Sequence, residues 1–257
     1  MDKSVEKIFS LWEQLGVSKK PGNLVTHRDI NQVSLEMRTI SKLLNAKDVL
    51  LDIGCGNGFT TSIHAKKCLK TIGIDYSKNM IAAAKKTYEN RKLHFEVGDA
   101  LTLNYKKGAF TTIISTRCLI NLTSWNKQKR AIFNLAETLD SGGKLILTEG
   151  IRQGRKNLNQ LRQKLGLNPM PDVWHNLDFD EDKLLPLLGR YFILQQDIRF
   201  GLYDVLTRAF YPAGIYPRQP KYGTPFHSAA EKLTTLIKDQ KDLRKYSREA
   251  CLVLIKK

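Results

Sequence analysis

A glycine-rich turn that follows a short apolar run constrains this chain more than any other feature. The run leads into Asp52-x-Gly54-x-Gly56-x-Gly58, and the residues from Phe59 onward have a helix-like pattern. A run of this length and composition is typical of a buried parallel strand. Glycines let the backbone turn sharply and lie close to a ligand, which then meets the amide groups at the start of the next helix. The motif therefore predicts a strand–turn–helix unit that binds a ligand.

Three further strand-like segments follow at the intervals expected of alternating strands and helices. Residues 71–77 contain Asp75, a carboxylate that can accept hydrogen bonds from both hydroxyls of a ribose at the end of a second strand. Residues 93–100 contain Asp99, which can accept from an adenine amino group, and residues 110–117 form the fourth segment. All these endings fall at the carboxyl ends of strands, where open α/β sheets bind ligands.

The turn, Asp75 and Asp99 together resemble class I S-adenosylmethionine-dependent methyltransferases over roughly residues 45–150. The competing interpretation is a nicotinamide dinucleotide fold, but its Gly-x-Gly-x-x-Gly fingerprint needs a glycine where this chain has Phe59. The resemblance implies an enzyme of class EC 2.1.1.- with S-adenosylmethionine as cofactor and S-adenosylhomocysteine as product. The cofactor-binding residues that it implies are Asp52, Gly54, Cys55, Gly56, Gly58, Asp75, Tyr76, Asp99, Ala100 and Ser115.

Alternating strand and helix signals predict one α/β domain with a Rossmann-like, doubly wound sheet. The resemblance implies seven strands, mostly parallel, with the last strand antiparallel. Residues 1–47 are expected to form a helical cap, in which Pro21-Gly22-Asn23 separates two helices and Asp29 caps the second. Residues 48–150 are expected to form the cofactor-binding core.

Two excursions from the sheet are expected in the second half of the chain. Residues 151–180 and 201–245 predict insertions on the substrate side, the first with a polar helix and the second with four prolines. Residues 181–190 predict a helix between them, and the segments 191–198 and 250–255 predict strands. A length of 257 residues suits one large domain with such insertions.

The net charge of +17 bears on the choice of partner. It favours a polyanion, but the basic residues are dispersed and form no stripe interleaved with aromatic side chains. We therefore attribute the charge first to lysines dispersed over solvated faces, with attraction of a phosphorylated small substrate as the second possibility. The expected partner is a small polar acceptor rather than a nucleic acid. The chain shows no signal peptide, no membrane span and no cysteine spacing that suits a metal. These patterns predict a cytoplasmic enzyme that acts without a metal ion.

Methyl transfer from a sulfonium is an in-line displacement, so the protein must align the acceptor and, for a hydroxyl, remove a proton. Arg117 and Asn121 interrupt an apolar run after the fourth strand, and a buried arginine needs an anionic partner. That partner is either an anion of the substrate or an acid such as Glu149, and both alternatives stay open. Glu149 is also a candidate base, and the donor-rich segment after it, with Arg152, suits a polar acceptor.

A second candidate group lies in the first insertion, where Trp174, His175 and Asn176 are consecutive. His175 titrates near neutral pH and is the candidate general base. Trp174 could stack on a sugar or a base, and Asn176 could orient the imidazole or bind the substrate. The alternative is that Trp174 anchors the insertion to the core and His175 caps a helix.

The segments 116–122 and 174–176, with Glu149 and Arg162, resemble a bacterial group of methyltransferases associated with surface-polysaccharide or nucleotide-sugar pathways. This resemblance implies O-methylation of a sugar, a nucleotide sugar or a phosphate-linked precursor of a surface or capsular polysaccharide. N-methylation of nucleic acid is an alternative, but the chain lacks an Asn/Asp-Pro-Pro-Tyr-type tetrad after the fourth strand. A non-catalytic adenosylmethionine-binding protein is another, although the glycines and both ligand acids are intact.

Overall fold

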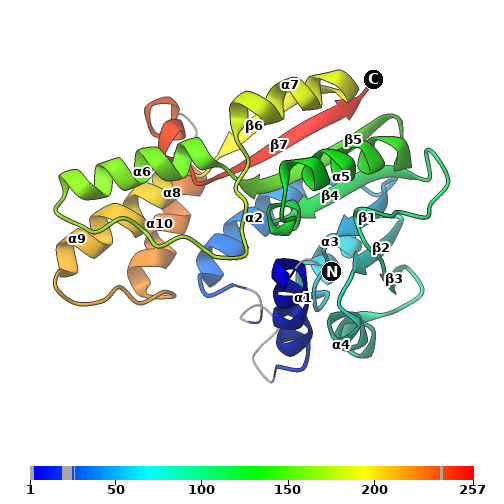
Figure 1. Cartoon of the computed structure of the whole chain (residues 1–257), viewed down its shortest axis with the longest axis horizontal. Coiled ribbons are helices and arrows are strands. Elements are labelled where there is room, and N and C mark those ends of the chain that lie inside the picture. The colour runs from blue at the N-terminus through cyan, green and yellow to red at the C-terminus, as the bar shows by residue number, and fades with distance from the viewer. Residues whose placement is uncertain (1–2, 19–24, 26, 238–239) are drawn as a thin grey trace.

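The computed structural model describes residues 3–18, 25, 27–237 and 240–257, and the predicted break at Pro21-Gly22-Asn23 lies outside them. The described residues form a seven-stranded sheet in the order β3-β2-β1-β4-β5-β7-β6, flanked by helices (Figure 1). The strands are β1 (Val49–Ile53), β2 (Lys70–Asp75), β3 (Leu93–Val97), β4 (Phe110–Thr116), β5 (Leu139–Gly150), β6 (Phe192–Arg199) and β7 (Glu249–Lys256).

The helices alternate with the strands in the first half of the chain and cluster in the second half. The α-helices are α1 (Lys3–Gly16), α2 (Ile30–Leu43), α3 (Phe59–His64), α4 (Lys78–Tyr88), α5 (Trp125–Thr138), α6 (Arg152–Lys164), α7 (Glu181–Tyr191), α8 (Gly201–Val205), α9 (Tyr211–Ile215) and α10 (Pro225–Leu236). The described residues also form the 3-10 helices η2 (Ala65–Lys67), η3 (Leu119–Asn121) and η5 (Lys241–Tyr246). A π-helix, η4 (Leu206–Phe210), joins α8 to α9.

Strands β1 to β5 pair in parallel, and β7 pairs antiparallel with both β5 and β6. The predicted mostly parallel sheet with an antiparallel last strand is therefore confirmed. Because β7 runs in the opposite direction, its first residue Glu249 lies opposite Gly150 at the end of β5. The carboxyl ends of the parallel strands and the amino end of β7 thus meet at one edge of the sheet, where ligands of such folds bind.

Alternate residues of the strands point into separate cores. Leu51 of β1 packs in the cluster that α5 and α7 cover, whereas Leu50 packs in the cluster that α2, α8 and α10 cover. Both predicted N-terminal helices are present, and Asp29 caps α2 as predicted, accepting from the amide of Gln32 at 3.1 Å. Helix α2 therefore belongs to a core layer, while α1 packs on α4 beside the cofactor turn.

The two insertions lie together in space. Helix α6 packs against η4 and η5, and Figure 1 shows α6, α8, α9 and α10 as one group at the end of the molecule away from β1, β2 and β3. Helix α6 begins at Arg152, earlier than the sequence indicated, and its first turn lies close to the chain at Ser247. A Cβ atom on Gly154 would come within 1.6 Å of the Ser247 carbonyl oxygen, so this approach requires glycine.

Candidate active site

The glycine-rich turn leaves β1 along a path that glycine permits. Gly54, Gly56 and Gly58 have φ angles of 72°, 54° and 78°, a region that other residues rarely adopt. The amide of Gly54 donates to the carbonyl of Ile74 at 2.8 Å, which ties the turn to β2. A Cβ atom on Gly54 would lie 2.5 Å from Sγ of Cys118. Glycine is therefore needed at this position for both backbone conformation and space.

Two predicted cofactor acids lie at the ends of β2 and β3. Asp75 accepts from the amides of Gly56 at 3.0 Å and Ser77 at 2.9 Å, so it joins the turn to the end of β2. Burial raises the pKa of Asp75 to about 6, although these two hydrogen bonds oppose that effect. Asp99 is exposed and accepts from the amide of Leu101 at 2.9 Å. Both acids line the same cavity, as a nucleoside-binding pair must.

The other predicted cofactor residues divide between the cavity wall and positions behind it. Asp52 lines the cavity and accepts from the hydroxyl of Thr61 at 2.6 Å, and burial raises its pKa to about 7. Gly58 lies behind the wall as the N-cap of α3. Ser115 is buried and donates to Glu149 at 2.8 Å, so its side chain does not face the cofactor space. The predicted residues that line the cavity are Asp52, Gly54, Cys55, Gly56, Asp75, Tyr76, Asp99 and Ala100.

A cavity of about 1130 Å³ extends from the cofactor loops to the two insertions. Beyond the cofactor loops, its wall includes α1, the start of α2, the loop after α6, the π-helix η4, the segment between α9 and α10 and the start of β7. Sites for one small molecule typically enclose roughly 300–1,000 Å³, so this volume can hold an acceptor beside a cofactor. We call the part beyond the cofactor loops the acceptor chamber; its walls include Glu36, Arg117, His175, Arg208 and Glu249.

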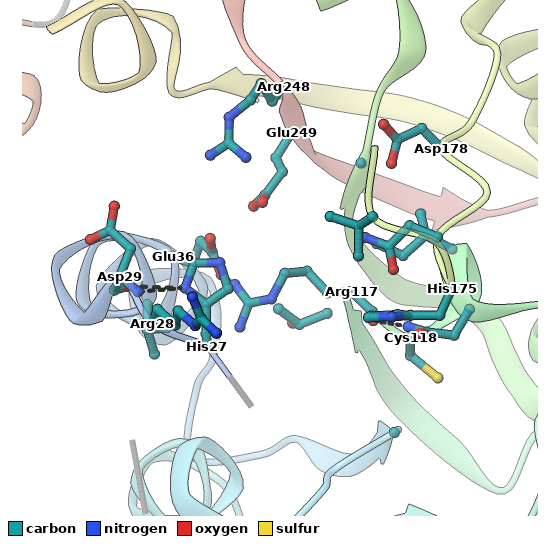
Figure 2. Close-up of a pocket in the computed structure, with 18 of the residues that line it drawn as sticks. His27, Arg28, Asp29, Glu36, Arg117, Cys118, His175, Asp178, Arg248 and Glu249 are labelled. Atoms are coloured by element: carbon teal, nitrogen blue, oxygen red, sulfur yellow. Dashed lines mark hydrogen bonds and ion pairs between the residues drawn. The ribbon is translucent and has the colours of Figure 1, made fainter. Parts of the chain in front are cut away.

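Arg117, Glu36 and Glu249 form a buried charged cluster in the acceptor chamber (Figure 2). Arg117 is ion-paired with Glu36, which differs from the alternative pairing with Glu149. Burial, together with the nearby negative charge of Glu249, raises the pKa of Glu36 well above its usual range, although the charge of Arg117 opposes this effect. Burial opposes ionisation of Glu249 as well, but Arg117, Glu36 and Arg248 outweigh it and lower the pKa of Glu249 to about 2. The charge of Arg117 therefore acts on both carboxyl groups, and the charge of Arg248 acts on Glu249.

Arg117 has a strained backbone conformation that aims its side chain. Its φ angle is 51°, a left-handed value that costs a residue with a Cβ atom about 1–2 kcal/mol. Its amide donates to the carbonyl of Thr148 at 2.8 Å, and its carbonyl accepts from Nδ2 of Asn121 at 2.8 Å. These bonds hold the end of β4 so that the guanidinium reaches Glu36 on α2 (Figure 2). Strain of this kind is concentrated at functional sites.

His175 lies on the loop after α6, which is fastened to η3, the 3-10 helix after β4. The amide of Leu177 donates to the carbonyl of Ile120 at 2.6 Å. The imidazole lines the chamber, with its centroid 5.9 Å from the ring of Trp12 and 5.2 Å from that of Trp174. Burial lowers the pKa of His175, and its Nδ1 has no hydrogen-bond partner among the described residues. A neutral imidazole with an unpaired nitrogen can accept a proton.

Glu149 does not line the cavity, although the sequence made it a candidate base and a candidate ligand of substrate hydroxyls. Its carboxylate accepts from the hydroxyl of Ser115 at 2.8 Å and from the amides of Cys118, Leu119 and Ile120 at 3.2, 2.9 and 3.2 Å. Burial raises its pKa to about 7 against these bonds. The geometry therefore fits a structural role, in which Glu149 fastens the segment after β4.

Two predicted substrate residues lie outside the acceptor chamber. Arg152 is ion-paired with Asp180 at 3.3 Å on the surface. Trp174 is 61% exposed and lies over α1 on the outside of the molecule. Asn121 and Asn176 line the chamber. Of the three consecutive residues predicted in the loop after α6, His175 and Asn176 therefore line the cavity and Trp174 does not.

Several chamber residues were not singled out as site candidates from the sequence. They are His27, Glu36, Arg208, Arg248 and Glu249. One signal was available, because Glu36 shares the buried face of α2 with Val33 and Ile40. A buried charge on an apolar face requires a partner or a ligand.

The fold and the turn together define the class of the protein. A seven-stranded sheet of this order, with one antiparallel strand and a glycine-rich turn after β1, is the class I S-adenosylmethionine-dependent methyltransferase fold. Residues 50–143 match the family model for a methyltransferase domain. This part of the chain is therefore a methyltransferase domain that uses S-adenosylmethionine, which confirms the predicted fold, cofactor and enzyme class.

Solved structures share this fold over nearly the whole chain. A methyltransferase from Haloferax volcanii, in complex with the Trm112 methyltransferase activator, has a TM-score of 0.64 at 12% identity and covers 95% of this chain and 96% of its own. The N-methyltransferase NodS from Bradyrhizobium japonicum, in complex with S-adenosylhomocysteine, has a TM-score of 0.59 at 14% identity, with 97% of each chain covered. At such identities the likeness shows the fold and not the acceptor.

Curated relatives match a shorter stretch. The tRNA (carboxymethyluridine(34)-5-O)-methyltransferase alkbh8 of Xenopus tropicalis is 29% identical over 99 residues, which are 38% of this chain and 15% of the relative. Ajmaline N-methyltransferase of Rauvolfia serpentina is 33% identical over 110 residues, which are 40% of this chain and 36% of the relative. The chain thus spans well under two thirds of either relative, and their named substrates differ from each other.

Within the described ranges, no helix is long and apolar enough to cross a lipid bilayer. Those same residues include no group of three or more His, Cys, Asp or Glu side chains that could hold a metal ion. Catalysis without a metal stays a prediction.

Proposed function

We propose that this protein transfers a methyl group from S-adenosylmethionine to a hydroxyl of a small polar acceptor. The observation that supports this is the acceptor chamber, which continues the cofactor cavity and is lined by buried charged groups. A concave chamber with a few convergent polar groups is typical of small-molecule sites. An acceptor held there would lie next to the methyl group of the cofactor.

The chamber offers hydrogen-bond acceptors to a molecule with several hydroxyl groups. Oε1 of Glu36 and Oε2 of Glu249 are buried and lack hydrogen-bond partners within the described part of the chain. An unsatisfied buried acceptor costs about 1–3 kcal/mol, so hydroxyl donors would be stabilised here. A sugar, a nucleotide sugar or a phosphate-linked precursor of a surface polysaccharide supplies such donors. The surface-polysaccharide assignment rests on the sequence resemblance alone.

Methyl transfer to a hydroxyl requires one displacement and one proton transfer. The acceptor oxygen attacks the methyl carbon in line with the departing sulfur, giving a methyl ether and S-adenosylhomocysteine. We assign the proton to His175, because burial favours its neutral form and its Nδ1 is unpaired among the described residues. Asn121 and Asn176 are assigned to binding the acceptor. Arg117 is assigned to positioning, since its guanidinium is already paired with Glu36.

His175→Ala tests the assignment of the base. A screen of nucleotide sugars for release of S-adenosylhomocysteine first supplies the acceptor. The variant is expected to bind S-adenosylhomocysteine normally and to lose about 10²–10⁴-fold in turnover, the usual contribution of a positioned base. Trp174→Phe is the matched control, because this adjacent ring lies outside the chamber, and it should keep its turnover. Full turnover in His175→Ala would refute the assignment.

Calorimetry with S-adenosylmethionine, S-adenosylhomocysteine and NAD tests the donor directly. We expect both adenosyl ligands to bind and NAD not to bind. Binding of NAD alone would make the turn a dinucleotide site. Turnover is also expected to survive chelation, and its loss with recovery on addition of a divalent ion would show that a metal takes part.

N-methylation of nucleic acid is the second candidate. The net charge of +17 and the relative named as a tRNA methyltransferase favour a nucleic-acid acceptor, although that relative's name gives methylation on oxygen. Transfer RNA offered in the same assay tests it. Methylation of tRNA, with no reaction of any sugar acceptor, would replace the first proposal. A protein that binds S-adenosylhomocysteine but methylates neither class would fit the non-catalytic alternative.

A further inference from the structure

Two arginine side chains meet in the acceptor chamber where α6 lies against the π-helix η4. Arg162 is in the last turn of α6, and Arg208 is in η4. Nη1 of Arg162 donates to the backbone carbonyl of Arg208, and both residues line the chamber. In Figure 1, α6 and α9, the helix that continues η4, lie side by side in the group of helices formed by the insertions.

The charge of Arg162 has no acidic partner in the ranges that the structure describes. Its Nε and Nη1 donate to the carbonyl oxygens of Asn168, at 2.9 Å, and of Arg208, which carry no net charge. Burial and the nearby charge of Arg208 lower the pKa of Arg162. Two adjacent cations in a partly buried place destabilise each other unless an anion lies between them.

Arg208 is only partly satisfied. It is 6% exposed, forms an ion pair with Asp29 and donates to Oε1 of Gln32 at 3.0 Å, in both cases through Nη2. Its Nη1 is buried without a hydrogen-bond partner among the described residues. Within the described residues, only Arg208 of the two has a carboxylate partner, so the positive charge of Arg162 and the buried Nη1 donor of Arg208 remain uncompensated. A buried donor without a partner costs free energy that a bound acceptor would recover.

The surroundings of the pair also suit a ligand. Short π-helical turns such as η4 are frequent at functional sites. The ring of Tyr222 lies 4.8 Å from the guanidinium carbon of Arg208 and is 44% exposed, so it covers the cation from the outside and can move without disturbing a core. Arg218 is a further cation that lines the chamber.

We propose that Arg162 and Arg208, covered by Tyr222, form a subsite for an oxyanion of the acceptor, either a phosphate or a carboxylate. Guanidinium groups bind both through charge-assisted N–H donors, and either anion would neutralise the uncompensated charge. The inference rests on the proposed function in one respect, namely that the anion belongs to the methyl acceptor. It narrows the acceptor to a molecule with hydroxyl groups and an acidic group, such as a sugar phosphate or a sugar acid.

Inorganic phosphate and malonate are the probes that test the subsite. Each is titrated into the full chain at constant ionic strength, with chloride as the reference anion, and the unfolding temperature and binding heat are measured. Arg162→Gln is expected to weaken binding of the preferred probe by about tenfold or more, the value of charge-assisted hydrogen bonds. Arg244→Gln is the matched control, because Arg244 also donates to a backbone carbonyl, that of Asp197 at 2.9 Å, but lies outside the chamber. It should bind the probe like the wild type.

Affinity for S-adenosylhomocysteine is measured on each variant as a report of folding, which separates this test from that of the proposed function. Equal probe affinity in the wild type and Arg162→Gln, or no binding of either probe to the wild type, would overturn the subsite and leave the methyltransferase proposal standing. If Arg162→Gln does not fold, Tyr222→Leu takes its place, with weaker probe binding expected and unchanged binding again overturning the subsite. Tighter binding of phosphate or of malonate identifies the anion.

Discussion

Gly54 and Gly142 have nearly the same φ angle, 72° and 70°, in very different surroundings. A Cβ atom on Gly54 would lie 2.5 Å from Sγ of Cys118, whereas one on Gly142 would have no heavy atom within 4 Å. Backbone strain alone costs a residue with a Cβ atom about 1–2 kcal/mol in this region. The two glycines thus separate the effect of strain from that of a clash at the cofactor turn.

Gly54→Ala is expected to weaken binding of S-adenosylhomocysteine by about tenfold or more, because the turn must move away from Cys118 to relieve the clash. Gly142→Ala is expected to lower the free energy of unfolding by about 1–2 kcal/mol and to leave cofactor affinity unchanged. Calorimetry and urea denaturation measure the two effects. Equal cofactor affinity in both variants would mean that the turn does not hold the cofactor.

A second prediction at this scale concerns pH. Burial raises the pKa of Asp75 to about 6 in the ligand-free protein. Ribose hydroxyls that donate to this carboxylate favour its charged form, so affinity for S-adenosylhomocysteine should rise as the pH rises through about 6. Calorimetry should show binding about tenfold weaker at pH 5 than at pH 8.

Asp75→Asn is the control for this pH dependence. It should bind more weakly overall and should lose the slope near pH 6, while any slope near pH 7 belongs to Asp52 or Glu149, whose pKa values burial raises to about 7. An affinity that is flat between pH 5 and pH 8 in the wild type would show that the ribose does not bind this carboxylate.

Among the elements, α2 joins the core to the acceptor chamber. Leu35 and Ile40 pack in the core under the sheet, and Glu36 faces the chamber. Its N-cap Asp29 also accepts from the hydroxyl of Tyr203 on α8 at 2.7 Å and is ion-paired with Arg208 on η4. One carboxylate therefore fixes the start of α2 to the second insertion.

Asp29→Ala should consequently lower the free energy of unfolding far more than the loss of an ordinary helix cap does. We expect the free energy of unfolding to fall by about 3–5 kcal/mol, because Arg208 would be left buried without its charged partner. Ser77→Ala, which removes the cap of α4 that accepts from the amide of Met80 at 3.1 Å, should cost about 1 kcal/mol. Urea denaturation compares the two, and equal losses would show that the ion pair adds nothing beyond the cap.

Sequence patterns predicted the elements well because most strands are continuous apolar runs bounded by polar turns. Their boundaries were less predictable. Strand β5 begins at Leu139, ahead of its apolar run from Leu145 to Leu147, because Leu139 pairs with Phe110 before an irregularity in the register. Such pairings depend on a distant strand and leave no mark in the local sequence.

For the molecule as a whole, the two halves of the cavity differed in how far sequence could predict them. The cofactor half is built largely from backbone groups of one short segment, so its glycines form a motif that can be recognised in the sequence. The chamber is built from side chains of distant segments, among them Glu36, Arg117, Arg208 and Glu249. Each is an isolated charged residue within its own stretch of sequence. Its role depends on burial, which arises only when α2, η4 and β7 pack together.

The place of β7 between β5 and β6, both of which precede it in the chain, has a consequence for biosynthesis. Strands β1 to β5 can pair as they leave the ribosome, so the cofactor turn can form early. Strand β6 has β7 as its neighbour in the sheet and must wait for it. Arg248 and Glu249 take their places in the chamber only when β7 pairs with β5. The cofactor turn can therefore form in the nascent chain before the acceptor chamber is complete.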